Sequence, residues 1–399
     1  MLSAQTIATV KATIPLLESA GTAITQHFYE RMFRLNPELK DIFNMSNQHS
    51  GRQQFALFSA IAAYAKNIET PEVLAAAIER IAHKHTSLHV QPHHYGIVGH
   101  HLIETLRELA PDAFTPEVEA AWTEAYGFLA NVFINREGAI YAESKAQEGG
   151  WNGTREFVVS TKTPESALVT SFVLSPADGG AVADYQPGQY LAVRVKPEGA
   201  DYWEIRQYSL SDKSNGRHYR ISVKRETGAK PGTVSHYLQD VIQPGDRIQV
   251  MPPVGDFFLK SAHTPNVFIS AGVGVTPMMS MLETLAATGS EQPIHFLHAC
   301  ETPQQHSFAG RIRELEQQVP ALSSYHWYAR NTDAATADAN SRTGLMELAP
   351  ISADLPLTDG NFYLCGPSGF MKFVKDQLLA LDVANDRIHY EVFGPHAEL

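Results

Sequence analysis

The chain has 399 residues, a length that suggests two or three domains. It carries 31 Lys and Arg against 43 Asp and Glu, a formal net charge of −12, which disfavours a nucleic-acid-binding protein because phosphate backbones bind cationic surfaces. Its two cysteines, Cys300 and Cys365, are too few for an iron–sulfur cluster or a disulfide scaffold and favour a reducing cytoplasm. We expect neither a secretory signal nor a membrane span, since the least polar stretch, 266–282, is broken by glycine and proline.

Three patterns follow one another along the chain. Residues 1–141 carry apolar side chains at helical spacing and predict an all-α domain. The polar, glycine-rich segment 142–153 predicts a linker. Short β-prone runs separated by turn residues predict an antiparallel β-barrel or sandwich over 154–262. Strands alternating with helical segments predict an α/β domain with a mainly parallel sheet over 263–399.

One histidine in the helical region lies on an apolar helix face. Leu74, Ile78, Ile81 and His85 recur at helical spacing, whereas His83 lies off that face. A lone histidine in such a place is most often a core residue bonded to a backbone carbonyl. The pattern therefore leaves two readings open, a core residue and a metal ligand.

Further polar residues lie on apolar stripes in the same region. Glu137 continues a stripe on the last helix, and a buried carboxylate is costly unless it is paired. A hydrogen-bonded chain of Glu137, Tyr95 and His85 would satisfy all three groups and would orient a metal-bound imidazole. Gln53 and Tyr29 are polar members of a facing apolar pocket, so the spacing fits both an ordinary helical core and a slot for a flat cofactor. The tandem histidines at 93–94 and 100–101 are interpreted as surface residues.

A short run in the β-rich region carries side chains that suit a cofactor with a pyrophosphate and a flat ring. Alternation along the strand sends Arg206 and Tyr208 to one face and Gln207 and Ser209 to the other. A guanidinium beside an aromatic ring suits a pyrophosphate joined to a flat ring, although an ordinary strand with polar residues has the same pattern. Downstream, residues 232–235 precede a helical segment whose amide groups and Ser235 could hold phosphate.

Two strand ends in the α/β region predict a nucleotide crevice. The segment 272–277 (GVGVTP) follows one strand and opens a helix, and Cys365 with Gly366 and Pro367 does the same after another strand. Two such ends in one parallel sheet mark a ligand crevice. Glu301, near the end of a third strand, slightly favours NADH over NADPH because a carboxylate suits ribose hydroxyls better than a 2′-phosphate.

Several strings in the sequence resemble one known family. IPLL, HFYERMF, NPELKDIFNMSNQ, IAAYA, HKHTS and NVFINRE are similar to those of the flavohaemoglobins, the nitric oxide dioxygenases, and the likeness runs from Met1 to Leu399. It implies a multidomain chain: an all-α globin domain, an antiparallel β-barrel FAD domain, and an α/β parallel-sheet NAD(P)-binding domain like that of ferredoxin–NADP reductase. It also implies one haem b, one FAD, and NAD(P)H as cosubstrate.

The same resemblance implies the role of individual residues. His85 is the proximal iron ligand, Tyr95 and Glu137 form the proximal relay, and the haem pocket holds Tyr29, Gln53, Phe43 and Leu57. Lys84 and Glu391 are placed near the flavin–haem boundary. The flavin is assigned Tyr190, Arg206, Gln207, Tyr208, Ser209, Val234, Ser235, Glu391, Val392, Phe393, Gly394 and Pro395. The pyridine nucleotide is assigned Gly272, Val273, Gly274, Val275, Thr276, Pro277, Cys365, Gly366 and Pro367. Val275 departs from the glutamine of relatives.

These assignments predict a nitric oxide dioxygenase that converts NO and O₂ to nitrate, with electrons passing from NAD(P)H to FAD to haem. Its partners would be small molecules, its state monomeric and its location cytoplasmic. Two alternatives remain. A flavin reductase of ferric chelates, quinones or a partner protein would use the helical region for docking, and a gas sensor or carrier would bind without catalysis.

Overall fold

The computed structural model describes residues 2–45, 51–228, 232–330 and 339–394. By their contacts, the residues fall into two compact units. The first unit comprises 1–146 and 194–206, and the second comprises 147–193 and 207–399. Among the described residues, none of the helices is long and apolar enough to cross a membrane.

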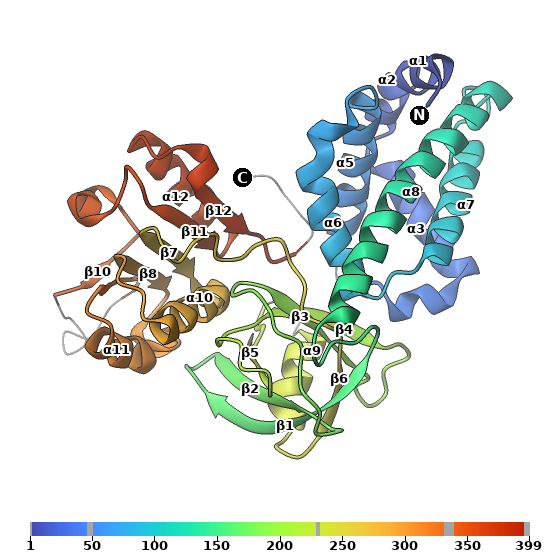
Figure 1. Ribbon diagram of the computed structural model, residues 1–399. Coiled ribbons are helices and arrows are strands. Elements are labelled where there is room, and N and C mark those ends of the chain that lie inside the picture. The colour runs from blue at the N-terminus through green and yellow to red at the C-terminus, as the bar shows by residue number, and fades with distance from the viewer. Residues whose placement is uncertain (1, 46–50, 229–231, 331–338, 395–399) are drawn as a thin grey trace. The chain divides into compact units, whose positions relative to one another are not determined.

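The first unit is built from packed helices (Figure 1). They are α1 (Ala4–Ala12), α2 (Ile14–Ala20), α3 (Thr22–Leu35), η1 (Pro37–Asp41), α5 (Arg52–Lys66), η2 (Pro71–Leu74), α6 (Ala75–Ser87), α7 (Pro92–Leu109) and α8 (Pro116–Ala146). The prediction of an all-α region is confirmed. Helix α8 continues to Ala146, so residues 142–146 of the segment predicted as a linker are helical. The segment AESKA consists mainly of good helix formers, and the first strong breakers are Gly149 and Gly150.

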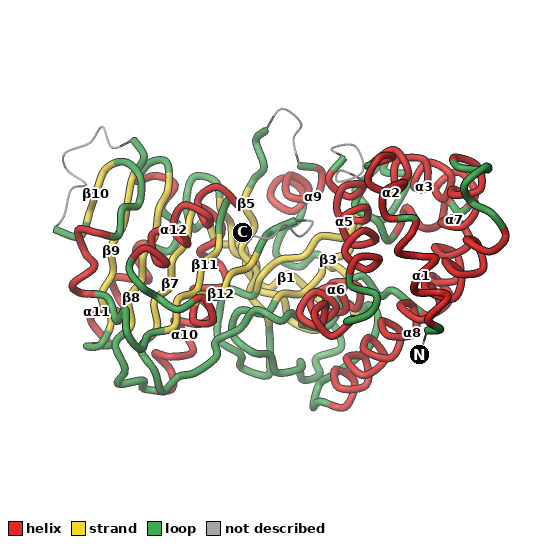
Figure 2. The backbone as a smooth tube through the Cα atoms, turned by 90° about the horizontal axis from the view of Figure 1, so that it is seen from above, coloured by secondary structure: helices red, strands yellow, loops and turns green. Residues whose placement is uncertain are grey.

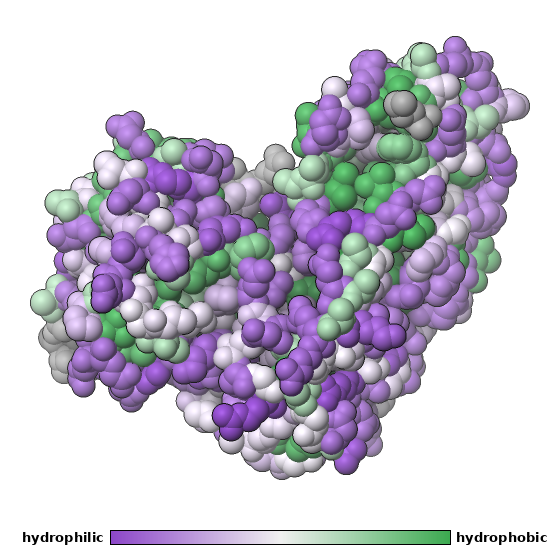
Figure 3. All heavy atoms as spheres, viewed as in Figure 1, coloured by the Kyte–Doolittle hydropathy of each residue, from purple (hydrophilic) through white to green (hydrophobic). Residues whose placement is uncertain are grey.

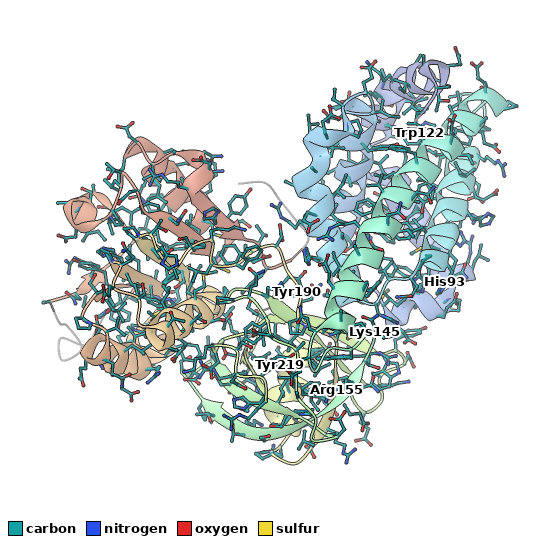
Figure 4. All side chains as sticks on the ribbon, viewed as in Figure 1. His93, Trp122, Lys145, Arg155, Tyr190 and Tyr219 are labelled. Carbon is teal, nitrogen blue, oxygen red and sulfur yellow. The ribbon has the colours of Figure 1, made fainter. Side chains whose placement is uncertain are left out.

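Two apolar clusters form the interior of this unit. One cluster joins α1, α2 and α3 to α8, where Trp122 points inward and donates a hydrogen bond to the Thr13 hydroxyl at 3.1 Å (Figure 4). The other cluster surrounds Phe28 and Tyr29 on α3 and Leu102 on α7. His85 on α6 contacts Tyr95 on α7 and Glu137 on α8.

The β-rich part of the chain, residues 155–250, contains an antiparallel sheet. Its strands are β1 (Arg155–Pro164), β2 (Val169–Pro176), β3 (Tyr190–Val195), β4 (Glu204–Ser209), β5 (Tyr219–Lys224) and β6 (Arg247–Val250), in the order β4-β3-β6-β1-β2-β5. A bridge between Leu210 and Ile221 connects the end of β4 to β5, so the two edges meet as in a barrel. Each strand overlaps one of the predicted β-prone runs. Two short segments follow β5, the helix α9 (Thr233–His236) and the π-helix η3 (Tyr237–Val241).

The remainder of the second unit contains a six-stranded parallel sheet (Figure 2). Its strands are β7 (Asn266–Ala271), β8 (Ile294–Cys300), β9 (Leu322–Tyr328), β10 (Ser341–Thr343), β11 (Asn361–Cys365) and β12 (Ile388–Glu391), in the order β10-β9-β8-β7-β11-β12. Helices α10 (Val275–Thr288) and α11 (Ala309–Gln318) cover one face, and α12 (Ser368–Ala380) covers the other. The strand order reverses between β7 and β11, which is where ligands bind in sheets of this type.

Candidate functional site

The structure brings together His85, Tyr95 and Glu137 from helices α6, α7 and α8. The Nδ1 atom of His85 lies 2.8 Å from Glu137 Oε1 and 2.9 Å from the Tyr95 hydroxyl oxygen. Tyr95 donates its hydroxyl proton to the same carboxylate oxygen at 2.5 Å. Glu137 is only 2% exposed, and His85 and Tyr95 are the two hydrogen-bond partners that this buried carboxylate needs.

These hydrogen bonds fix the state of the imidazole. Burial, reinforced by the charge of Glu137, holds the pKa of Tyr95 well above its usual value of 10. Tyr95 therefore keeps its proton for Glu137, and we infer that the proton of the His85 ring lies on Nδ1, facing the carboxylate. The Nε2 lone pair is then available, and no hydrogen bond to Nε2 occurs among the described residues. This is the arrangement of a metal-ligating histidine with a carboxylate behind it.

An apolar cluster with flat side chains lies in the same helical unit as His85. Tyr29 stacks on Phe33 at 5.8 Å between ring centroids and meets the edge of Phe43 at 5.9 Å. Phe43 and Leu57 are only partly buried although they belong to an interior apolar cluster. The His85 side chain itself is 33% exposed. Apolar side chains left partly uncovered and a histidine nitrogen donor in one helical unit are the components that an iron porphyrin requires.

Two further predicted residues lie on these helices, Gln53 from the predicted pocket and Lys84 from the predicted flavin–haem boundary. Gln53 lies half-buried on α5, one turn before Leu57, as its stripe predicts. Lys84 is half-buried and adjoins His85 on α6.

Sequence reasoning missed two aromatic residues beside the relay. Phe133 packs against the His85 ring at 5.7 Å and against Tyr95 at 6.3 Å. Tyr126 donates its hydroxyl to the Tyr95 carbonyl at 2.6 Å. Both lie on the α8 stripe that carries Glu137, so their helical spacing was the available signal.

The interpretation of the tandem histidines is wrong for His101. His93 is exposed (Figure 4), but His101 is only 2% exposed, and its Nε2 lies 2.8 Å from Asn36 Oδ1. Arg31 contacts the other ring nitrogen of His101 at 2.5 Å. Consecutive helical residues point about 100° apart, so one of two adjacent histidines can face the interior.

A separate hollow of about 400 Å³ lies between α5, η2, α6 and α8. Its walls are mostly apolar, and apolar side chains gather on this face of the helical unit (Figure 3). Ile78, Leu129 and Val132 contribute to it, whereas His85 does not. It is therefore distinct from the histidine site.

The flavin candidates lie on β3 and β4. Tyr190 begins β3, and a side chain at Gly255 would come within 3.1 Å of the Tyr190 ring, so the ring lies close over this glycine. Figure 4 marks Tyr190 in this sheet. Arg206 pairs with Glu204, two residues earlier on the same strand face, at 2.8 Å. Gln207 and Tyr208 are half-buried and Ser209 is buried.

In the segment predicted to bind phosphate, 232–235, the helix begins earlier than expected. Thr233 to His236 form the helix α9, so Val234 and Ser235 lie within a helical turn rather than before one. Val234 is 1% exposed. The Ser235 hydroxyl donates to the Gly232 carbonyl at 3.1 Å and accepts from the Glu226 amide at 3.3 Å. The hydroxyl is therefore committed to shaping this turn.

The two strand ends predicted to form a nucleotide crevice do meet. A Cβ atom at Gly274 would lie 2.2 Å from the Cys365 carbonyl oxygen and 2.8 Å from the Gly366 nitrogen. Gly272, with φ of +54°, makes the turn after β7. Only glycine fits at position 274, because any side chain would collide with the backbone that follows β11. Val273 is half-buried, whereas the side chains of Val275, Thr276 and Pro277 are buried, so these three can offer a ligand only backbone groups.

The end of the chain adjoins this crevice. In the register of β11 with β12, Glu391 is the partner of Cys365. Burial, with the Glu391 charge nearby, raises the pKa of the Cys365 thiol well above its ordinary value. Pro367 precedes α12, Val392 and Gly394 are half-buried, and Phe393 is 43% exposed. Pro395 lies outside the described residues.

The carboxylate at the end of β8 has a partner that the sequence did not reveal. Arg330 follows β9 and donates to the Glu301 carboxylate at 2.8 Å, while its backbone amide donates to the Glu301 carbonyl at 2.8 Å. The two side chains are 76% and 54% exposed, respectively. They stand together at the carboxyl ends of neighbouring parallel strands.

Comparison with known proteins accords with this division. Residues 26–133 match the globin family, 156–259 an oxidoreductase FAD-binding domain and 268–376 an oxidoreductase NAD-binding domain. A flavohemoprotein of Vibrio cholerae serotype O1 is 58% identical over 401 residues, covering all of both chains. The chain belongs to the flavohemoprotein family.

Solved structures of flavohemoproteins share this fold. The crystal structure of the Malassezia yamatoensis flavohemoglobin with bound FAD and heme has a TM-score of 0.87 and 27% identity, covering 98% of this chain and all of that chain. The FAD/NAD-binding domain of the Vibrio cholerae nitric oxide dioxygenase has a TM-score of 0.56 and 52% identity, covering 60% of this chain and 99% of that chain. The expected three-part fold of this flavohemoprotein is confirmed.

Proposed function

We propose that this flavohemoprotein is a nitric oxide dioxygenase that catalyses 2 NO + 2 O₂ + NAD(P)H → 2 nitrate + NAD(P)⁺ + H⁺. The observation that carries the proposal is the His85–Glu137–Tyr95 cluster, which leaves Nε2 of His85 able to bind iron. The same chain contains the FAD-binding and NAD-binding domains of an oxidoreductase. Bound haem b supplies the iron at which O₂ and NO react, and bound FAD converts the hydride of NAD(P)H into single electrons.

The proximal residues make His85 a strong electron donor. Glu137 accepts a hydrogen bond from the Nδ1–H of His85 and so gives the ring partial imidazolate character. Tyr95 holds the carboxylate in place through its own hydrogen bond. On the opposite side of the pocket, Tyr29 and Gln53 are the polar groups we assign to hydrogen-bonding the reactants, within walls that Phe43 and Leu57 keep apolar.

The reductase residues bind and orient two nucleotides. Arg206 supplies the charge for the FAD pyrophosphate, and Tyr190 supplies a flat surface. The turn at Gly274 lets the pyridine nucleotide approach the backbone, and Cys365 lines the end of β11 beside Glu391. We assign NADH as the preferred donor because the Glu301 carboxylate would repel a 2′-phosphate.

We also infer the organisation and setting of the protein. The globin domain spans 1–141, the linker 142–153, the FAD domain 154–262 and the NAD(P)H domain 263–399. A monomer in the cytoplasm fits two free thiols, Cys300 and Cys365, and small-molecule substrates.

The test of the proposal is nitrate production. Purified holoprotein supplied with NADH, O₂ and NO is expected to consume NO and release an equal amount of nitrate. Absence of nitrate under saturating O₂ contradicts the proposal, and flavin reduction without any haem absorption would indicate a plain flavin reductase instead.

The proximal assignment is tested by substitution. His85→Ala is expected to abolish the Soret band while NADH still reduces the flavin. His83→Ala is the matched control, because His83 lies on the same helix but pairs with Glu79 at 3.1 Å, and it should keep the haem spectrum. A normal haem spectrum in His85→Ala would show that another residue binds the iron.

A further inference from the structure

Three imidazole rings cluster inside the parallel-sheet part of the second unit. His298 on β8 lies 5.0 Å from His306, and His306 lies 5.2 Å from His326 on β9, measured between ring centroids. His298 is 1% exposed. None of the proposed redox steps uses these residues. Among the described residues, no group of three metal-binding side chains has the geometry of a metal site, so a metal ion does not explain the cluster.

Hydroxyl groups hold the rings in place. The Nδ1 atom of His298 lies 2.9 Å from the Ser270 hydroxyl on β7. The Nδ1 atom of His306 lies 2.9 Å from the Tyr328 hydroxyl on β9. The Nε2 atom of His298 is buried without a hydrogen-bond partner. A proton arriving at this cluster thus meets no carboxylate among these contacts.

His306 belongs to a loop, residues 301–308, that also contacts the β-barrel of the same unit. Within this loop the Gln304 carbonyl accepts a hydrogen bond from the Ala167 amide at 2.9 Å. Ser307, 1% exposed, donates its hydroxyl to Ser166 at 3.0 Å. The loop is therefore fixed to the histidine cluster on one side and to the barrel on the other.

Phe308 completes this attachment. It is 3% exposed and lies 5.5 Å below the guanidinium of Arg220 on β5. Its φ of +62° is unusual for a bulky residue. Such a conformation is strained and persists only where the surroundings impose it. The loop therefore depends on its contacts to keep this shape.

Burial and the charged neighbours named below oppose a positive charge on His298 and His306. Burial lowers the pKa of His298 to about 3, with His326 adding to the effect. Burial, then His298, His326 and Arg313 on α11, lower the pKa of His306 well below its usual value. His298 and His306 are therefore neutral while the loop is closed, and a proton binds more readily when the loop opens.

We propose that the neutral rings of His298, His306 and His326 hold the 301–308 loop closed, and that protonation of the cluster in acid opens the loop. Opening breaks the contacts of the loop with the β-barrel and so weakens the packing of the nucleotide-binding sheet against the barrel. Hydride transfer requires the nicotinamide and the flavin to be held together, so loss of this packing slows flavin reduction. This last consequence rests on the proposed function, whereas the opening of the loop does not.

Hydrogen exchange of the holoprotein tests the proposal. Peptides covering 301–308 are compared at about pH 7.5 and about pH 5.5, corrected for intrinsic exchange. Opening is expected to increase by up to about tenfold per pH unit for each proton taken up. Stopped-flow reduction of the flavin by NADH is expected to slow over the same interval.

Two variants distinguish protonation of the histidine cluster from other effects of low pH on the protein. His306→Gln can still accept the Tyr328 hydrogen bond but cannot become charged, so its loop protection should become independent of pH. His295→Gln is the matched control, because His295 lies on the opposite face of β8, bonded to Ser323 at 2.9 Å, and it should behave as wild type. An equal pH response in all three proteins overturns the proposal.

Histidine NMR of the wild type decides the matter even if His306→Gln does not fold. Selective ¹⁵N labelling of histidine reports the charge of each ring during a pH titration. Protonation of His306 over the same pH range as loop opening supports the proposal. Loop opening while His306 stays neutral overturns it. Both readouts are independent of nitrate formation, so failure of the dioxygenase proposal is recognised separately.

Discussion

At the scale of single residues, the Glu137 carboxylate matters most, because it contacts Nδ1 of His85 from within the core and so acts on the ring that we propose binds iron. Glu137→Gln keeps the shape but removes the charge, so His85 becomes a weaker donor. We expect NO turnover to fall by about tenfold to a hundredfold with the haem retained. Steady-state NO consumption measures the rate, and a lower iron–histidine stretching frequency in the Raman spectrum reports the cause.

The matched control is Glu143→Gln, on the same helix α8 with a side chain 68% exposed. It should leave both the rate and the Raman frequency unchanged. If Glu137→Gln lowers the rate without moving the iron–histidine frequency, the carboxylate acts through something other than the proximal ligand.

The proposed preference for NADH is tested at Glu301. Glu301→Gln removes the charge that repels a 2′-phosphate and leaves Arg330 without its partner. We expect the ratio of kcat/KM for NADH over NADPH to fall by about tenfold, equal to ~1.4 kcal/mol. Glu291→Gln, an exposed carboxylate before the start of β8, should leave the ratio unchanged. An unchanged ratio in Glu301→Gln would place the adenosine ribose elsewhere.

At the scale of elements, the turn between β7 and α10 packs closely against the backbone at the end of β11. Gly274→Ala would push a methyl group into the Cys365 carbonyl. We expect a loss of about 1–3 kcal/mol in stability and a rise in the KM for NADH, while FAD content is unchanged. Thermal unfolding and NADH titration measure the two effects.

Gly310→Ala is the control for that substitution. Gly310 lies in α11, and a methyl group added there would have no neighbour within 4 Å, so the change should stabilise the helix by up to about 1 kcal/mol. If Gly274→Ala binds NADH as well as Gly310→Ala does, the turn does not take part in nucleotide binding.

At the scale of the whole molecule, buried neutral histidines make stability depend on pH. Burial lowers the pKa of His94 and His389 to about 4 and that of His298 to about 3, and it also lowers the pKa of His101. In the unfolded chain these rings titrate near 6.5. The unfolded state therefore binds more protons below about pH 6.5, and the free energy of unfolding falls as the pH drops toward about 4.

Urea unfolding followed by circular dichroism checks this expectation. The midpoint should be lower at about pH 5 than at about pH 7.5. His389→Gln should reduce the difference, whereas His93→Gln, at an exposed position, should not change it. A midpoint that does not change with pH would show that these histidines are also shielded in the unfolded chain.

The amino-acid sequence by itself determined the three kinds of structure and their order. Helical spacing, alternation and turn residues are local signals, and they also placed Glu137, Tyr95 and His85 on faces that could meet. The family strings added the cofactors. The helix end at Ala146 was missed because linker-like polar residues are also good helix formers.

Only the tertiary structure decided which distant residues are neighbours. The partnership of Glu301 with Arg330, the approach of Gly274 to Cys365, and the histidine cluster all depend on the strand order of the parallel sheet. The burial of His101 depends on the packing of α3 against α7. Periodicity reports which face of an element is apolar, but it carries no information about which element covers that face, because the choice is made by packing of the whole chain.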